Sequence, residues 1–402
     1  MFAHLLKLIW KRKTRNLLLS LEIFLAFAIV FAIAAFALRS AQLYRMPLGF
    51  DYTDVWSVDI LAVGSPESAF NAELYDRFKR GLEALPEVRQ VAFSDASPFT
   101  NRTSRSSYAM PGASGASGGG SVKANIMEVS DDFFAVNNIK LLEGRAFARS
   151  DDGAAALPVV INQRMAHTLF GSGPVIGMQF RANNERKTAL KVVGLVEEFR
   201  NKGEFMAPVN FILLRYVAQP DAAGPRSILL KLAPGTARSF EMNLSRQLKL
   251  IRNDWSYTIT PLAALRASQL RNGLMPLMVL AVVAAFLLAM VAFGLFGVLW
   301  QATTQRIPEI GLRRAIGASA GHIYRQIIAE QFLLSTGAML AALVLLVQLP
   351  LTGALGEAMN WGVFGAAAAL SVSVIYLLSL LCSLYPGWRA SRLSPTEALH
   401  YE

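Results

Sequence analysis

The sequence predicts a membrane α-helical protein, with four transmembrane helices and a large α+β extracytoplasmic domain of two subdomains. Composition gives the first indication, because 53% of the 402 residues are hydrophobic while 17% are charged. The hydrophobic share exceeds that of an ordinary soluble domain, and the charged share exceeds that of a bundle lying wholly in lipid. Four long apolar runs and a one-sided distribution of lysine and arginine then place the spans and set their direction.

Each apolar run is long enough to cross a bilayer, since about 30 Å of hydrocarbon takes roughly 20 helical residues. Any one of them would also suit a buried helix of a large soluble domain, but four in one chain favour membrane spans. The second and the fourth contain no charged residue. We expect the spans at residues 17–39, 274–300, 327–349 and 363–384.

Two acidic residues interrupt these runs, Glu22 in the first and Glu330 in the third, each about one turn from the run's start. Charged side chains are costly in lipid and often mark a transport path. Both acids lie near the same membrane surface, however, where a carboxylate reaches headgroups or a basic neighbour. We therefore interpret them as interfacial or structural partners rather than as a transport path.

Basic residues indicate the orientation of the spans, because lysine and arginine gather in cytoplasmic segments. Five precede the first span, within residues 1–16, and further arginines lie in 301–326 and 385–402. The short loop 350–362 has none and is expected outside. Both termini are thus expected in the cytoplasm and residues 40–273 outside it. A signal peptide is the alternative for the first span, but the apolar run is long for one.

The net charge of +11 does not by itself indicate nucleic-acid binding. Its localised part flanks the spans, where anionic lipid headgroups are the expected partners. The only cysteine, Cys382, falls in the fourth span. The exported segment is therefore expected to fold through its own apolar core, without a disulfide.

The exported segment contains a strand–helix–strand pattern at each of its ends. Residues 54–60, 72–84 and 88–94 form the first, and residues 227–232, 240–251 and 256–260 the second, with Ser239 as a helix N-cap. We expect both to build one α+β subdomain from about 50–96 and 225–262; two unrelated units are the alternative. Strands predicted at 159–162, 190–196 and 210–214 favour a second, β-rich subdomain at about 122–220.

Two further features of this segment are expected to face solvent. Residues 97–121 are rich in serine and glycine, which predicts a mobile loop with little to bury. The adjacent acids Asp131 and Asp132 resemble a metal site only superficially and are expected to begin a helix in solvent, as are Asp151 and Asp152.

Signatures of catalysis are absent from the sequence. It never contains Gly-Lys, which the phosphate-binding loop requires, and it has no HExxH motif and no cysteine pair. Its four histidines are scattered. We expect a chain that catalyses no reaction and binds neither a cofactor nor a metal ion itself.

The segment after the second span carries the most specific motif. Residues 305–318 read QRIPEIGLRRAIGA, and residues 385–399 read YPGWRASRLSPTEAL. Both resemble the permease region of FtsX-like ABC transporters, the MacB group especially, although Pro308 and Gly387 depart from the usual pattern. The resemblance implies that 306–318 is a coupling helix on an ABC ATPase; a basic loop bound to lipid is the alternative. The expected coupling residues are Arg306, Glu309, Ile310, Gly311, Arg313, Arg314, Ala315, Gly317 and Ala318.

The exported middle adds to the resemblance. Residues 129–134, 141–145, 159–162 and 192–196 resemble the MacB-type periplasmic core domain. The family resemblance implies a permease subunit in a bacterial inner membrane that works by mechanotransmission, with ATP and magnesium on a separate ATPase subunit. It further implies a second permease copy or related permease, a periplasmic adaptor and an outer-membrane channel that exports a peptide, toxin or antibiotic.

Two alternatives within the wider family stay open from the sequence. One is a LolC-like permease that extracts lipoproteins and passes them to a carrier. The other is a non-transporting activator of cell-wall hydrolases like FtsX, which the 234-residue exported segment disfavours because that protein's domain is usually smaller. A receptor with an extracytoplasmic sensor is more remote, since no signalling segment follows the spans.

Overall fold

The computed structural model describes residues 13–61, 71–109, 121–183, 188–217, 224–353 and 355–392. They form two compact units. The helical unit contains residues up to 42 and from 274 onward, and the α+β unit contains residues 43–273. Two long helices cross this boundary in the chain, so that the end of one and the start of the other fall within the α+β unit.

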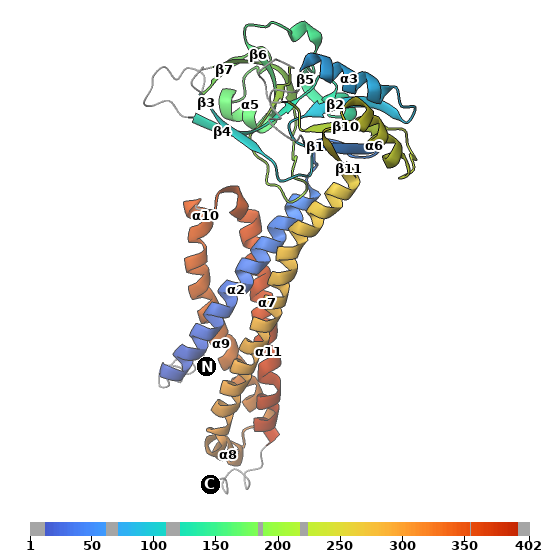
Figure 1. The fold of residues 1–402 in the computed structure, drawn as a ribbon. Coiled ribbons are helices and arrows are strands. Elements are labelled where there is room, and N and C mark those ends of the chain that lie inside the picture. The colour runs from blue at the N-terminus through green and yellow to red at the C-terminus, as the bar shows by residue number, and fades with distance from the viewer. Residues whose placement is uncertain are drawn as a thin grey trace. The chain divides into compact units, whose positions relative to one another are not determined.

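The helical unit contains four helices that are long and apolar enough to cross a membrane (Figure 1). These are α2 (Lys13–Arg45), α7 (Leu262–Thr304), α9 (Ala320–Leu346) and α11 (Trp361–Arg392). Helices α2, α7 and α11 continue beyond both ends of their predicted spans, whereas α9 begins before its predicted span and ends within it. The segment between α7 and α9 contains α8 (Ile307–Ala315), and the predicted loop 350–362 contains the end of α10 (Gln348–Thr352) and η2 (Gly356–Met359).

Helices α9 and α11 lie side by side and are joined by polar contacts as well as apolar ones (Figure 1). The hydroxyls of Ser335 and Ser379 are 2.9 Å apart, and those of Thr336 and Tyr376 are 2.8 Å apart. Such bonds hold helices together in lipid, where burying apolar side chains provides little driving force. Phenylalanines of α2 fill the same core, with Phe27 and Phe31 almost fully buried.

The first part of the α+β unit is built from both ends of its sequence. Its strands are β1 (Val55–Leu61), β2 (Val88–Ser94), β10 (Ser227–Leu232) and β11 (Ser256–Pro261), and its helices are α3 (Ala72–Glu83) and α6 (Phe240–Ile251). The strands pair in the order β11-β1-β10-β2, all antiparallel. Both helices bury an apolar face in one core with these strands, through residues such as Phe78 and Leu244.

The second part is rich in β-structure and closes on itself. It contains β3 (Ser104–Ala109), β4 (Ser121–Val129), β5 (Leu141–Gly144), β6 (Leu157–Asn162), β7 (Gln179–Ala182), β8 (Ala189–Val196) and β9 (Phe211–Arg215), with α4 (Phe133–Val136), η1 (Arg149–Asp151) and α5 (Gln163–Phe170). Pairing runs β4-β3-β7-β8-β6-β9, and β9 pairs again with β4, which makes a ring. Only one residue pair, Ser94↔Val129, joins this ring to β2.

Local periodicity predicted most of these elements. Strands β2 and β10 and helix α6 have the predicted bounds. Ser239 occupies the predicted N-cap position of α6, although its backbone is in the αR region (φ −60°, ψ −20°) and its side chain makes no capping hydrogen bond. Asn71 and Asn162 do cap helices, each accepting a hydrogen bond from the backbone three residues on.

The predicted mobile loop was wrong in part. Residues 104–109 form β3, which pairs with β4 and β7, because Tyr108 is buried in the ring core. Residues 110–120 of the same prediction lie outside the described residues.

Asp131 and Asp132 do begin a helix, as predicted, since Asp132 is the N-cap residue of α4. Asp151 and Asp152 instead lie at the end of η1, so the prediction was wrong for this pair. Arg215 binds Asp131 and Asp152, both at 2.6 Å, while Asp132 pairs with Lys79 and Asp151 pairs with Arg145. Each carboxylate thus has a cation within the fold, and Arg215 of β9 joins two loops that are distant from it in the sequence.

Candidate functional site

Helix α8 contains the motif that the sequence singled out, and its two ends are set by local chemistry. Pro308 lies in the first turn, where a missing N–H leaves no helical bond unmade. At the other end Gly317 has φ +102°, and the N–H groups of Gly317 and Ala318 donate to the carbonyls of Arg314 and Arg313 at 3.1 and 3.0 Å. This Schellman pattern ends the helix, and Ser319 then caps α9.

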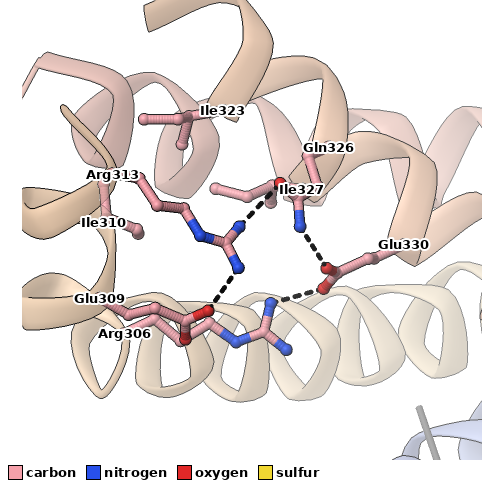
Figure 2. A pocket seen from close by; sticks show the side chains of 8 residues that line it. All are labelled: Arg306, Glu309, Ile310, Arg313, Ile323, Gln326, Ile327 and Glu330. Atoms are coloured by element: carbon pink, nitrogen blue, oxygen red, sulfur yellow. Dashed lines mark hydrogen bonds and ion pairs between the residues drawn. The ribbon is translucent and has the colours of Figure 1, made fainter. Parts of the chain in front are cut away.

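A chain of charged and amide side chains fastens α8 and the residue before it to α9 (Figure 2). Arg306 donates to Glu330 at 2.5 Å, and Gln326 donates to the other oxygen of Glu330 at 3.2 Å. Arg313 donates to Gln326 at 3.0 Å and to Glu309 at 2.6 Å. Three of these five residues were expected coupling residues, and Glu330 was expected as an interfacial or structural partner. Gln326 was missed, although its i, i+4 spacing to Glu330 signals a shared helix face.

The cavity that these side chains line is about 20 Å³, with Ile310, Ile323 and Ile327 as its apolar wall. A volume of this size holds about one water molecule. It is therefore not a binding pocket for a nucleotide or a transported molecule. The arrangement is suited to transmitting force between helices or to docking a protein on its outer surface.

Helix α8 has distinct inner and outer faces. Ile310 was expected to insert into the ATPase, but it is 6% exposed and packs against Ile323 and Ala390 within this unit. Leu312 and Ile316 are 58% and 79% exposed and, four residues apart, lie on one face. Ala315 is exposed beside them. The apolar outer surface is thus formed by Leu312, Ala315 and Ile316.

The remaining expected coupling residues divide between these faces. Gly311 is buried on the inner face, and Ala318 packs against the Ile310 cluster. Arg314 is half-buried and forms no ion pair with any residue in the described part of the chain. Unlike Arg313, which pairs with Glu309, Arg314 can therefore bind an acidic residue of a partner protein.

The second acidic residue of the spans behaves differently from Glu330. Glu22 lies on α2 against α7, so close to Gly294 that a side chain there would overlap its carboxylate. Within the described ranges it has no ion pair. The structure therefore brings only Glu330 together with the coupling segment.

A second polar cluster, which the sequence did not signal, lies where α2 ends and α7 begins in the α+β unit. Arg200 is 1% exposed and donates to the carbonyls of Leu43, Met46 and Met206, each at 2.9 Å, and to that of Glu204. The Glu204 carboxylate in turn accepts from Arg266 of α7 at 2.5 Å. One loop thus contacts both helices, and no local sequence pattern signals it.

Comparison with known proteins finds two family domains in the chain. Residues 23–241 match the MacB-like periplasmic core domain, and residues 281–395 match the FtsX-like permease C-terminal region. The macrolide export ATP-binding/permease protein MacB 1/2 of Paracoccus denitrificans is 26% identical over 69% of this chain and 42% of its own length. The pyoverdine export ATP-binding/permease protein PvdT of Pseudomonas aeruginosa is 26% identical over 67% of this chain and 41% of its own length.

Other relatives differ in how much of their length is matched. The uncharacterized ABC transporter permease YknZ of Bacillus subtilis is 20% identical over 90% of this chain and 86% of its own length. A crystal structure of the periplasmic region of MacB from Actinobacillus actinomycetemcomitans is 15% identical, covers 56% of this chain and 97% of its own, and gives a TM-score of 0.38. The chain spans less than half the length of the MacB and PvdT relatives.

The core-domain match alone extends over more than half of the chain, and the permease match lies in the C-terminal part of the helical unit. The chain belongs to the MacB/FtsX-type family of ABC transporter permeases and is a membrane protein with an extracellular domain.

Proposed function

We propose that this chain is the membrane part of a MacB-like export machine, in which ATP hydrolysis by an ABC ATPase is converted into motion of the extracellular domain. The observation that carries the proposal is the construction of α8. Its outer surface is apolar at Leu312 and Ile316, while its inner face is bonded to α9 through Arg306 and Glu330. A helix built in this way can receive a partner on one side and pass the displacement on through the other.

The inner bonds make this transmission plausible in physical terms. The side chains of Arg306 and Glu330 are only 20% and 12% exposed, so water screens their attraction little. Ile310 and Ile323 add apolar packing beside the ion pair. An ATPase that pulls or pushes α8 therefore displaces the start of α9 rather than bending a loose connection.

The proposal extends to the partners of the chain. ATP and magnesium would lie on the ATPase, with none bound by this chain. Leu312 and Ile316 would enter a groove of the ATPase, and Arg314 would meet an acid there. We infer that α8 and both termini face the cytoplasm, in a bacterial inner membrane, and that a second permease copy or a related permease completes a dimer.

The substrate belongs to the proposal as well. Two relatives are named for the export of macrolides and of pyoverdine, although this chain matches less than half of each. We propose that the extracellular domains drive a peptide, toxin or antibiotic, already outside the cytoplasm, through an adaptor and an outer-membrane channel.

Co-purification tests the central claim. The chain, extracted in mild detergent, is expected to carry an ABC ATPase with it. Leu312→Asp combined with Ile316→Asp should abolish that association, whereas the control Met242→Asp, which changes an equally exposed apolar side chain of α6, should not. Retention of the ATPase by the double variant would contradict docking on α8.

The same preparation separates the alternative functions. An adaptor and an outer-membrane channel among the co-purified proteins support export. A lipoprotein carrier would instead indicate extraction of lipoproteins, and a cell-wall hydrolase would indicate a regulator that does not transport.

A further inference from the structure

The α+β unit contains a second and larger cavity, at the seam between its two parts. It measures about 270 Å³ and lies where β2 and β4 separate after their single residue pair, Ser94↔Val129. Its lining comes from both sides of the seam, with Asp95 and Arg226 on one side and Glu128 and Arg102 on the other. Space of this size accommodates a small organic molecule rather than a few waters.

Two carboxylates line this cavity without a cation to neutralise them. The Glu128 N–H donates to Asp95 Oδ1 at 3.2 Å, so the two residues are immediate neighbours. Within the described part of the chain, neither side chain forms an ion pair. Burial, and secondly the Glu128 charge, raise the pKa of Asp95 to about 6. A positive group placed beside them would relieve this unfavourable concentration of charge.

Tyr216 provides an independent sign of a missing partner. The residue lines the cavity and is 8% exposed, yet its hydroxyl has no hydrogen-bond partner among the residues that the structure describes. A buried donor left unpaired costs about 1 to 3 kcal/mol, so such groups normally belong to a site that something else completes. Burial, and secondly the nearby Glu128 carboxylate, raise the pKa of Tyr216 to about 12, which keeps the hydroxyl protonated as a donor.

Two arginines supply the opposite charge on the same lining. The backbone N–H of Arg226 donates to the Ser94 carbonyl, which places Arg226 alongside Asp95, while Arg102 precedes β3. Both side chains are exposed, and neither forms an ion pair with any of the described residues. The lining thus offers both signs of charge without uniting them, and its apolar wall comes from Ile126.

We propose that this seam cavity binds a small zwitterion of the amino-acid or dipeptide kind. Its protonated amine meets Asp95 and Glu128, its carboxylate meets Arg102 and Arg226, and its side chain covers Ile126. This site does not depend on the ATPase or on α8, so a negative result for the dipeptide would leave the proposed function untouched, and the reverse also holds. Because the cavity joins the two parts of the unit, an occupied site would bridge them.

Calorimetry on the full chain in lipid nanodiscs tests the proposal with three probes: the dipeptide alanyl-leucine, its N-acetylated form and its C-amidated form. The free dipeptide is expected to bind saturably, and each blocked form at least about tenfold more weakly, because each loses one charged contact. No saturable binding up to about 10 mM, or equal affinity for either blocked form, would overturn the assignment.

Variants locate the binding within the cavity. Asp95→Asn and Arg226→Gln should each weaken binding at least about tenfold, whereas Glu143→Gln, at an exposed acid of β5 outside the lining, should leave it unchanged. Tyr216→Phe keeps the ring and removes only the unpaired hydroxyl, so it should weaken the dipeptide without lowering the melting temperature. Unchanged affinity in Arg226→Gln, which alters an exposed side chain and should fold normally, would place the ligand elsewhere.

Discussion

Arg266 of α7 donates to the carboxylate of Glu204 at 2.5 Å, and these two residues connect the start of a long helix to the loop that also encloses the end of α2. Glu204 is 5% exposed and Arg266 lies over the Tyr52 ring at 4.8 Å, so the pair is held in place from several sides. In the mechanism that we propose, motion of either helix reaches the α+β unit through this loop.

Breaking this pair should weaken the α+β unit. Arg266→Met leaves the Glu204 carboxylate buried without its cation, a loss of about 3 kcal/mol in the free energy of unfolding. Glu204→Gln combined with Arg266→Met removes both charges and should recover most of that loss. Thermal unfolding of the full chain checks both, and equal destabilisation by the single and double variants would contradict the pairing.

The ion pair between Arg306 and Glu330 makes a second prediction, on coupling. Arg306→Ala should reduce ATPase stimulation of the assembled complex and cost roughly 2 kcal/mol in stability, because Glu330 then loses its cation. Exchanging the two residues, with Arg306→Glu and Glu330→Arg together, should restore part of the coupling. A swap no better than the single variant would show that the pair does not transmit the motion.

The third prediction concerns the stability of the helix end at Gly317, where α8 stops. Its φ of +102° is strained for any residue with a Cβ, so Gly317→Ala should destabilise the helical unit by about 1 to 2 kcal/mol. Gly321→Ala is the matched control: a Cβ at this helical position meets no atom within 4 Å, and alanine favours a helix. The two melting temperatures should therefore move in opposite directions.

Asp95 predicts a pH dependence. Its pKa in the folded chain is raised, to about 6 from 3.8, so ionisation is harder in the folded state than in the unfolded one. Below its pKa in the unfolded chain, the Asp95 carboxyl leaves the free energy of unfolding unchanged. As the pH rises through its pKa in the folded chain, ionisation lowers that free energy by up to about 3 kcal/mol. Asp95→Asn should therefore be more stable than the unaltered chain at about pH 8 and similar to it at about pH 4. A difference independent of pH would contradict this.

The sequence alone determined the features that depend on neighbouring residues. Apolar length located the four long helices, and alternation or helical spacing located β2, β10 and α6. The motif around Gly311 indicated the family, and the comparisons confirmed it. The orientation inferred from the basic residues stays a prediction.

Only the tertiary structure decided which side chains meet. It turned Ile310 inward and left Ile316 outside, it brought Asp131 and Asp152 together on Arg215, and it closed the ring of strands through β4 and β9. The loop of Arg200 and the seam cavity have no local signature, because their partners are separated by tens to more than a hundred residues. Periodicity reports the local environment of a residue, whereas pairing across such distances is fixed only when the whole chain packs.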